Sequence, residues 1–158
     1  MQNNILVIDD NPLLIGIYER ILKPRPTPIR RLDSFSKVTV PEPPPQRGFK
    51  LILASQGEQS LELAKEFYKT GSSIQIAFVD FNMPPGWDGL QTAKELLLLD
   101  EKINIVIVSG LPQHNDIEFS TKLQRHVHVI SKPFPIKELV ELAHKLCETW
   151  NQDNPSKI

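Results

Sequence analysis

The residues of this sequence that could do chemistry stand at the ends of short apolar runs. They comprise three carboxylates, a hydroxyl and an ammonium: Asp9, Asp10, Asp80, Ser109 and Lys132. A carboxylate can attack a phosphoryl group to form an acyl phosphate, and a hydroxyl and an ammonium can bind the phosphoryl oxygens. Three carboxylates that lie close together repel one another and need a cation. Mg2+ is the natural candidate because it prefers oxygen ligands. These residue types therefore fit phosphoryl transfer to a protein carboxylate.

Five apolar runs must position these residues. The runs are short and mostly apolar, and the first is continuous, as is typical of strands buried on both faces: 5–8, 51–54, 76–79, 105–108 and 127–130. Because helical patterns separate the runs, the sequence predicts an α/β fold of the flavodoxin-like doubly wound type. Its five-stranded parallel sheet would have the order 2-1-3-4-5, with helices on both faces. In that order the carboxyl ends of the strands meet at one crevice, where we expect the polar residues to converge.

Local signals indicate where several helices begin and end. Asn11 and Pro12 predict the start of the first helix, and Gly71 predicts the end of the second. Ser55 and Glu58 have the spacing of a capping box. The apolar residues predicted to face the sheet are Leu14, Ile17, Tyr18 and Ile21 of the first helix, and Ile136, Leu139, Val140, Ala143, Leu146, Cys147 and Trp150 of the last. Residues 114–125 are weakly patterned and predict a short, less stable helix.

The composition is that of an ordinary globular protein. The 158 residues include 40% hydrophobic and 23% charged residues, and their formal net charge of −1 provides no basic field for nucleic acid or an anionic membrane. Cys147 is the only cysteine and cannot form an internal disulfide. The sequence shows no signal peptide and no apolar run long enough to span a bilayer. We therefore expect a cytoplasmic protein with no nucleic-acid or membrane partner.

One segment differs from the rest in composition. Residues 24–48 hold seven of the fourteen prolines, three of them in succession. Segments of this kind are typical of extended or mobile insertions. The sequence thus predicts one domain over residues 1–150, interrupted by this insertion and followed by a polar tail at 151–158.

Four stretches of the sequence resemble the signature of response-regulator receiver domains, which belong to bacterial two-component systems. They are Ile-Leu-Val-Ile-Asp-Asp at 5–10, Phe-Val-Asp-Phe-Asn-Met-Pro at 78–84, Val-Ile-Val-Ser-Gly at 106–110 and Ile-Ser-Lys-Pro-Phe at 130–134. The resemblance covers roughly residues 4–23 and 49–150. Each stretch alone is weakly specific, but their order along the chain is highly specific.

The resemblance implies a role for each polar residue. Asp80 matches the phosphoacceptor, Asp10 a direct Mg2+ ligand and Asp9 an acid that acts through a metal-bound water. The remaining matches are the backbone carbonyl of Asn82 as a third protein ligand, Ser109 as the switch hydroxyl, Lys132 as the lysine that pairs with phosphate, and Pro133 as a cis proline.

The resemblance also implies a signalling switch. The domain would accept a phosphoryl group on Asp80 from a phosphohistidine of a sensor histidine kinase or a histidine phosphotransfer protein. It would catalyse only its own phosphotransfer and dephosphorylation, so we do not expect a metabolic enzyme. A downstream effector would bind the face formed by the fourth helix, the fifth strand and the fifth helix. On that strand, Val129 stands where many receivers carry an aromatic switch residue.

Two alternatives start from the same residues. A pseudo-receiver would act only as a protein-interaction module, but the complete set of acids, serine and lysine argues against it. A magnesium-dependent aspartyl-phosphate phosphohydrolase typically has an Asp-x-Asp motif after its first strand. This chain instead has Asp9 and Asp10 in succession, and its expected nucleophile follows the third run. Failure to form an acyl phosphate would favour the first alternative, and turnover of a small phosphate ester the second.

Overall fold

Strands and helices alternate along the chain of this computed structural model, which describes residues 2–23, 48–110 and 126–155. The elements are β1 (Asn4–Ile8), α1 (Pro12–Leu22), β2 (Lys50–Ala54), α2 (Gly57–Lys69), β3 (Ile76–Asp80), α3 (Gly89–Leu99), β4 (Asn104–Ser109), β5 (Val127–Ser131) and α5 (Ile136–Asp153). All five predicted strands are present. The helix predicted at 114–125 and residues 24–47 of the predicted insertion lie outside the described residues. Within the described ranges, no helix is long and apolar enough to cross a membrane.

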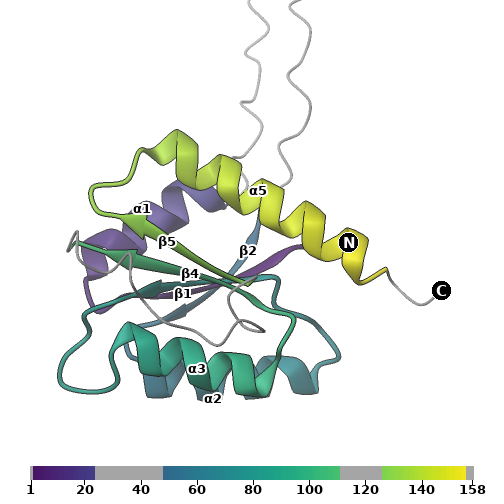
Figure 1. The fold of residues 1–158 in the computed structure, drawn as a ribbon, viewed down its shortest axis with the longest axis horizontal. Coiled ribbons are helices and arrows are strands. Elements are labelled where there is room, and N and C mark those ends of the chain that lie inside the picture. The colour runs from purple at the N-terminus through teal and green to yellow at the C-terminus, as the bar shows by residue number, and fades with distance from the viewer. Residues whose placement is uncertain (1, 24–47, 111–125, 156–158) are drawn as a thin grey trace, which may run out of the picture.

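The five strands form one parallel sheet in the order β2-β1-β3-β4-β5, which confirms the predicted fold (Figure 1). β1 lies between β2 and β3, with Ile8 opposite Val79 in the register. Asp80 is the last residue of β3 and lies opposite Val108 of β4. Because all the strands run in the same direction, the residues that follow β1 and β3 emerge side by side at one edge of the sheet.

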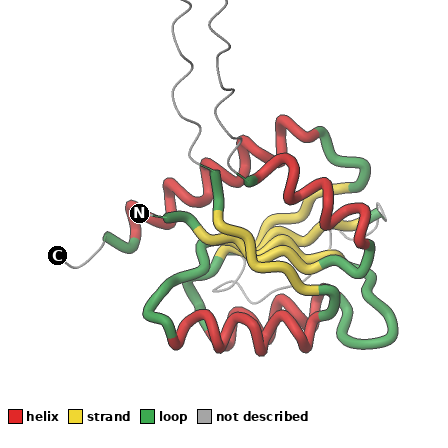
Figure 2. Tube along the Cα trace, turned by 180° about the vertical axis from the view of Figure 1, so that it is seen from behind, coloured by secondary structure: helices red, strands yellow, loops and turns green. Residues whose placement is uncertain are grey.

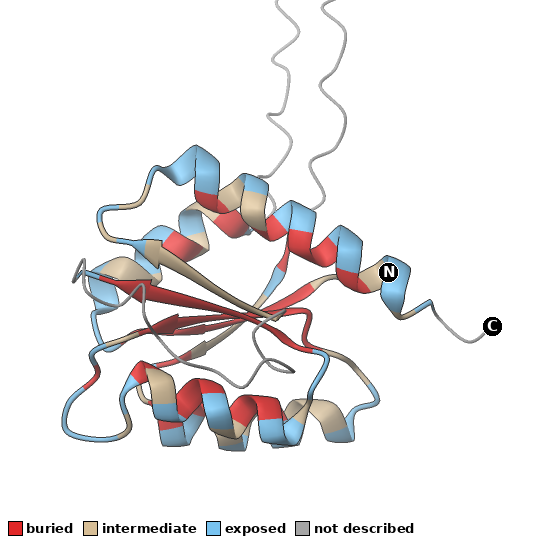
Figure 3. Ribbon diagram, viewed as in Figure 1, coloured by how far each residue is buried: buried red, intermediate tan, exposed pale blue. Residues whose placement is uncertain are grey.

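Helices cover both faces of the sheet. α1 and α5 lie on one face and α2 and α3 on the other, as views from opposite sides show (Figure 1, Figure 2). The central strands β1, β3 and β4 are buried along their whole length (Figure 3). Leu6 and Ile8 contribute to the core beneath α2 and α3, whereas Ile5 and Val7 contribute to the core beneath α1 and α5. Burial on both faces is the reason why these strands have unbroken apolar sequences.

Local signals locate several helix ends correctly. The Asn11 side chain accepts a hydrogen bond at 3.0 Å from a backbone N–H in the first turn of α1, and Gly71 after α2 has a φ of 78°. The last helix is longer than predicted, because α5 continues to Asp153 and includes the first three residues of the predicted polar tail. The side-chain amide of Asn151 donates to Asn3 Oδ1 at 3.0 Å, which ties this end of α5 to the residue before β1.

The predicted capping box at the start of α2 is wrong. The helix begins at Gly57, and the backbone N–H and hydroxyl of Ser55 donate to Oε1 of Gln59 at 2.8 and 3.1 Å. Gln59 lies one position beyond Glu58, so it takes the partner that the sequence pattern assigned to Glu58. The Glu58 side chain instead faces the loop that precedes α3.

Two apolar side chains predicted to face the sheet are exposed. Ile17 of α1 is 39% exposed, and Ile136 of α5 is 54% exposed. The buried residues of α1 are Tyr18 and Leu22, four positions apart, so the buried stripe runs beside Ile17 and not through it. Ile136 is the first residue of α5 and precedes the buried stripe of that helix, which starts at Leu139.

The residues that flank the proline-rich segment are hydrogen-bonded to each other. The backbone N–H of Phe49 donates to the carbonyl of Leu22 at 3.0 Å. Both residues are buried in the core beneath α1 and α5. The packed structure therefore joins α1 to the start of β2 through a contact that does not involve residues 24–47.

Replacing residues 24–47 with a short Gly/Ser linker should leave the melting temperature close to that of the unaltered protein, because the Leu22–Phe49 bond already closes the domain. Thermal unfolding followed by circular dichroism measures this. As a control, Phe49→Ala should lower the free energy of unfolding by about 3 kcal/mol or more, since it removes a buried aromatic side chain. A large drop in melting temperature for the linker variant would show that the segment packs as part of the core.

Candidate functional site

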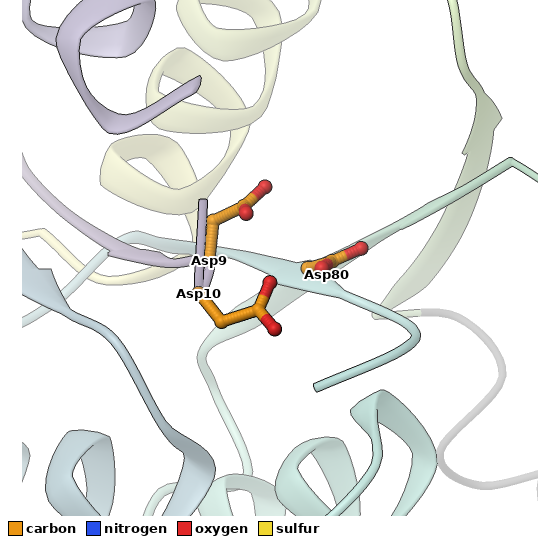
Figure 4. Close-up of side chains that lie close together, drawn as sticks. All are labelled: Asp9, Asp10 and Asp80. Atoms are coloured by element: carbon orange, nitrogen blue, oxygen red, sulfur yellow. The ribbon is translucent and has the colours of Figure 1, made fainter. Parts of the chain in front are cut away.

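Asp9, Asp10 and Asp80 meet at the carboxyl edge of the sheet (Figure 4). Asp9 and Asp10 follow β1 directly, and the backbone N–H of Asp9 still bonds to the carbonyl of Ala54 at the end of β2. Asp80 ends β3, the other neighbour of β1. One oxygen from each carboxylate lies within 4.8 Å of those from the other two. The predicted convergence of the three acids is therefore confirmed.

Asp9 is the most enclosed of the three acids. It is 2% exposed, against 7% for Asp80, whereas Asp10 is exposed at the surface. Oδ1 of Asp9 accepts a hydrogen bond from the backbone N–H of Asn11 at 2.8 Å. Burial raises the pKa of Asp9, and the Asp80 charge raises it further. The Asn11 N–H and the Lys132 ammonium oppose this rise without cancelling it. The charged form of Asp9 is thus disfavoured here, and a cation would favour it.

Lys132 places an ammonium between two of the acids. Its Nζ lies 3.0 Å from Oδ1 of Asp80 and 3.5 Å from Oδ2 of Asp9. The backbone N–H of Lys132 donates to the carbonyl of Ser109 at 2.8 Å, and its peptide bond to Pro133 is cis, as the resemblance implies. Three carboxylates (−3) and this ammonium (+1) sum to a formal charge of −2. One divalent cation would neutralise that charge.

Ser109 and Asn82 stand at the same edge of the sheet. Ser109 is buried at the end of β4, one residue beyond Val108, which lies opposite Asp80. Asn82 is exposed and follows Asp80 by two residues, where the chain leaves the sheet. The roles of the Ser109 hydroxyl and of the Asn82 carbonyl follow from the resemblance alone and stay predictions.

Three aromatic rings pack together near Asp9 and Asp80. The buried ring of Tyr18 on α1 has its centre 5.5 Å from that of Phe78 and 5.8 Å from that of Phe134. Burial, followed by the charges of Asp9 and Asp80, raises the pKa of Tyr18 above its usual value, so its hydroxyl keeps its proton. The helical pattern predicts Tyr18 as a core residue but does not predict its place near the acids. Such surroundings screen charge weakly and strengthen the interactions at this edge.

The three acids fit a magnesium ion. Mg2+ binds oxygens at about 2.0–2.1 Å in octahedral geometry, so opposite ligands lie roughly 4 Å apart. The carboxylate oxygens, which lie within 4.8 Å of one another, are close to that spacing. A set of oxygen donors without nitrogen or sulfur also selects a hard ion such as Mg2+. The charge and the chemistry of these side chains therefore both match this cation.

The loop between β3 and α3 makes a contact that the sequence does not reveal. Trp87 is half-buried, and its backbone N–H donates to Oε1 of Glu58 on α2 at 3.1 Å. In the same loop the peptide bond between Pro84 and Pro85 is cis. Glu58 and Trp87 are 29 positions apart, so no helical or strand period connects them. The sequence signal at Glu58 is its spacing from Ser55, which predicts a helix cap and not a contact with this loop.

Comparison with known proteins defines the class. The sequence model of the response regulator receiver domain family matches residues 45–144, which is more than half of the chain. The chain belongs to this family. Among curated proteins, it is similar to sporulation initiation phosphotransferase F of Bacillus subtilis (strain 168), with 26% identity over 100 residues that make up 63% of this chain and 75% of that protein.

Solved structures show the same fold. The CheY-like response regulator receiver domain protein of Methanospirillum hungatei JF-1 is 23% identical, with a TM-score of 0.64 over 96% of this chain and 99% of that one. The response regulator receiver protein of Sinorhizobium medicae WSM419 is 20% identical, with a TM-score of 0.60 over 94% of this chain and 97% of that one. At these identities the likeness concerns the fold, which agrees with the observed strand order.

The matched range covers only part of the site. Residues 45–144 include Asp80 and Lys132, but Asp9 and Asp10 lie before the proline-rich segment and outside the match. The sheet brings this acid pair to Asp80, because β1 pairs with both β2 and β3. The structure therefore places beside Asp80 the two acids of the cluster that the family match does not cover.

Lys132→Met should lower the free energy of unfolding by about 1–3 kcal/mol in the absence of divalent cations, because it leaves the buried acceptors of Asp9 and Asp80 without their ammonium partner. Mg2+ should restore part of the loss. Urea unfolding with and without Mg2+ measures both effects. Lys137→Met is the matched control, since Lys137 is exposed and lies 3.8 Å from Glu141. Equal stability of the two variants without metal would contradict the assigned role of Lys132.

Proposed function

We propose that this receiver domain accepts a phosphoryl group on Asp80 from a phosphohistidine of a histidine kinase or phosphotransfer protein, and so acts as a switch. The observation that carries the proposal is the position of Asp80, which contacts the Lys132 ammonium and lies within reach of Asp9 and Asp10. Membership of the receiver family supports it. The Bacillus subtilis relative is named a phosphotransferase, which supports phosphoryl transfer over hydrolysis of small esters.

Asp80 has one oxygen held by lysine and a second that can act as the nucleophile. Lys132 donates to Oδ1 at 3.0 Å, and Oδ2 accepts no hydrogen bond from the described residues. In the proposed step Oδ2 attacks phosphorus and the P–N bond of the phosphohistidine breaks. The electron pair of that bond goes to the ring nitrogen, and a proton on the second ring nitrogen makes the leaving imidazole neutral. The product is an acyl phosphate on Asp80.

The groups around Asp80 suit the transferred phosphoryl group. Lys132 can bind one of the new oxygens through its flexible ammonium, and the Ser109 hydroxyl would donate to another. Asp10, Asp80 and the carbonyl of Asn82 would hold Mg2+, with Asp9 acting through a bound water. The ion would supply positive charge to the phosphoryl oxygens in the transition state. The acids thus serve the reaction by holding a cation close to the nucleophile.

Exposed apolar side chains lie near this edge. Leu13 and Ile17 are 78% and 39% exposed on successive turns of α1, the helix that begins two residues after Asp10. A partner that presents its phosphohistidine to Asp80 needs a contact surface beside it, and these side chains provide an apolar one. We propose that the donor docks over the start of α1. The effector surface expected over β5 and α5 also involves residues 114–125, which lie outside the described residues, and it stays a prediction.

Asp80→Asn should abolish acyl-phosphate formation, because the amide cannot act as the nucleophile. Intact-mass spectrometry after incubation with acetyl phosphate and Mg2+ measures the modified fraction. Asp88→Asn is the matched control, since Asp88 lies in the same loop and only caps α3 through the N–H of Gln91. If the Asp80 variant were phosphorylated to the same extent as the wild type, Asp80 would not be the phosphoacceptor. If the wild-type protein were not phosphorylated either, the alternative of a pseudo-receiver that only binds partners would be favoured.

Asp10→Ala should weaken Mg2+ binding by at least about tenfold, because it removes a carboxylate assigned as a direct ligand. Isothermal titration calorimetry of the folded variant measures the dissociation constant. The Asp88→Asn variant should bind Mg2+ as the wild type does. Unchanged affinity in Asp10→Ala would place the metal elsewhere.

A further inference from the structure

The loop between β3 and α3, residues 81–88, is anchored next to Asp80. The backbone N–H of Gly89 donates to the carbonyl of Phe81 at 2.7 Å, which closes the base of the loop. A Cβ on Gly89 would lie 2.6 Å from the carbonyl oxygen of Asp80, so only glycine permits this approach. Met83 is buried in the core beneath α2 and α3. The base of the loop and Met83 are therefore anchored by the sheet and the core.

The second half of the loop is held by α2. The backbone N–H of Trp87 donates to Oε1 of Glu58 at 3.1 Å. Two glycines allow this contact. A Cβ on Gly86 would lie 2.6 Å from Oε2 of Glu58, and a Cβ on Gly57 would lie 3.1 Å from the Cβ of Trp87. The Glu58 carboxylate thus lies directly against the backbone of the loop.

Glu58 contributes little to the rest of the fold. Its side chain is exposed, and it forms no salt bridge with the described residues. An exposed hydrogen bond of this kind contributes little to global stability but can select the conformation of a loop. The effect of Glu58 is therefore expected in the loop and at the end of β3.

We propose that Glu58 is a positioning residue of the phosphorylation site, which holds the loop after Asp80 in place for metal binding and phosphoryl transfer. The inference rests on the proposed function, in which the carbonyl of Asn82 in this loop is a metal ligand. Without the Glu58 contact, the loop samples other conformations and the carbonyl of Asn82 occupies the ligand position for less of the time. Asp80 and Lys132 stay in place, because β3 and the end of β5 hold them.

The test compares Glu58→Ala, Glu58→Gln and Glu62→Ala in the full chain. Glu58→Ala should weaken Mg2+ binding and slow phosphorylation by acetyl phosphate by about three- to tenfold, below the range usual for groups bonded directly to a metal ligand. Glu58→Gln keeps a side-chain oxygen acceptor and should stay near wild type. Glu62→Ala removes the same charge one turn further along α2, from a side chain that pairs with Lys65, and should have no effect. Circular dichroism checks that all three variants are folded.

Gly86→Ala should remove the contact between Glu58 and the loop in a second way. Its Cβ would displace the carboxylate of Glu58 while leaving that residue in the sequence. The variant should resemble Glu58→Ala in Mg2+ affinity and phosphorylation rate. The double variant Glu58→Ala/Gly86→Ala should lose no more Mg2+ affinity or phosphorylation rate than Glu58→Ala alone, because both changes remove the same interaction.

Exchange of the Trp87 amide proton, followed by NMR, gives a readout that does not depend on phosphorylation. It should be faster in Glu58→Ala and Gly86→Ala and unchanged in Glu62→Ala. The inference would be overturned if Glu58→Ala left the exchange of the Trp87 amide or the affinity for Mg2+ unchanged. It would also be overturned if Glu58→Gln or Glu62→Ala lost as much Mg2+ affinity and phosphorylation rate as Glu58→Ala. An unlabelled wild type would overturn the proposed function instead, and the exchange measurement would still decide whether Glu58 holds the loop.

Discussion

The close approach of three carboxylates is the constraint on which the rest of the structure depends. Asp9 and Asp80 are buried, and Lys132 offsets only part of the charge around them. Because repulsion of this kind opposes folding, the apolar contacts of β1 and β3 on both faces of the sheet must hold the acids together. Strand pairing fixes the two carboxyl ends side by side. A cation or phosphoryl group that binds at this edge of the sheet therefore changes a site whose negative charge is only partly compensated.

The fold and the centre of the site could be predicted because the same residues encode both. β1, β3 and β4 are buried on both faces, so each is an unbroken apolar run, and alternation with helices leaves few strand orders to consider. Acids at the ends of two such runs then have to converge. How deeply Asp9 is buried could not be predicted, since burial of a residue at a strand end depends on how helices and loops pack around it and not on the period of the strand.

Contacts among helices and loops follow no period and could not be predicted in this way. Ser55 can reach a side chain three or four positions further on, and the structure selects Gln59 because Glu58 faces the backbone of a loop from elsewhere in the chain. Ile17 has the spacing of a core residue yet is exposed. Helical periodicity determines which residues share a face, but the width of the covered part depends on the elements packed against it.

The hydrogen bond between Leu22 and Phe49 brings together the two ends of the segment from residue 23 to residue 48. The entropy lost on closing a flexible loop grows with the logarithm of its length, by about 0.6 kcal/mol for each doubling. For a flexible connection, a fourfold increase in length would therefore oppose folding by only roughly 1.2 kcal/mol. The number of residues between α1 and β2 could therefore change several-fold during evolution with little effect on the folding equilibrium. Lengthening would mainly delay the pairing of β2 with β1, while β1 and β3 would keep their register.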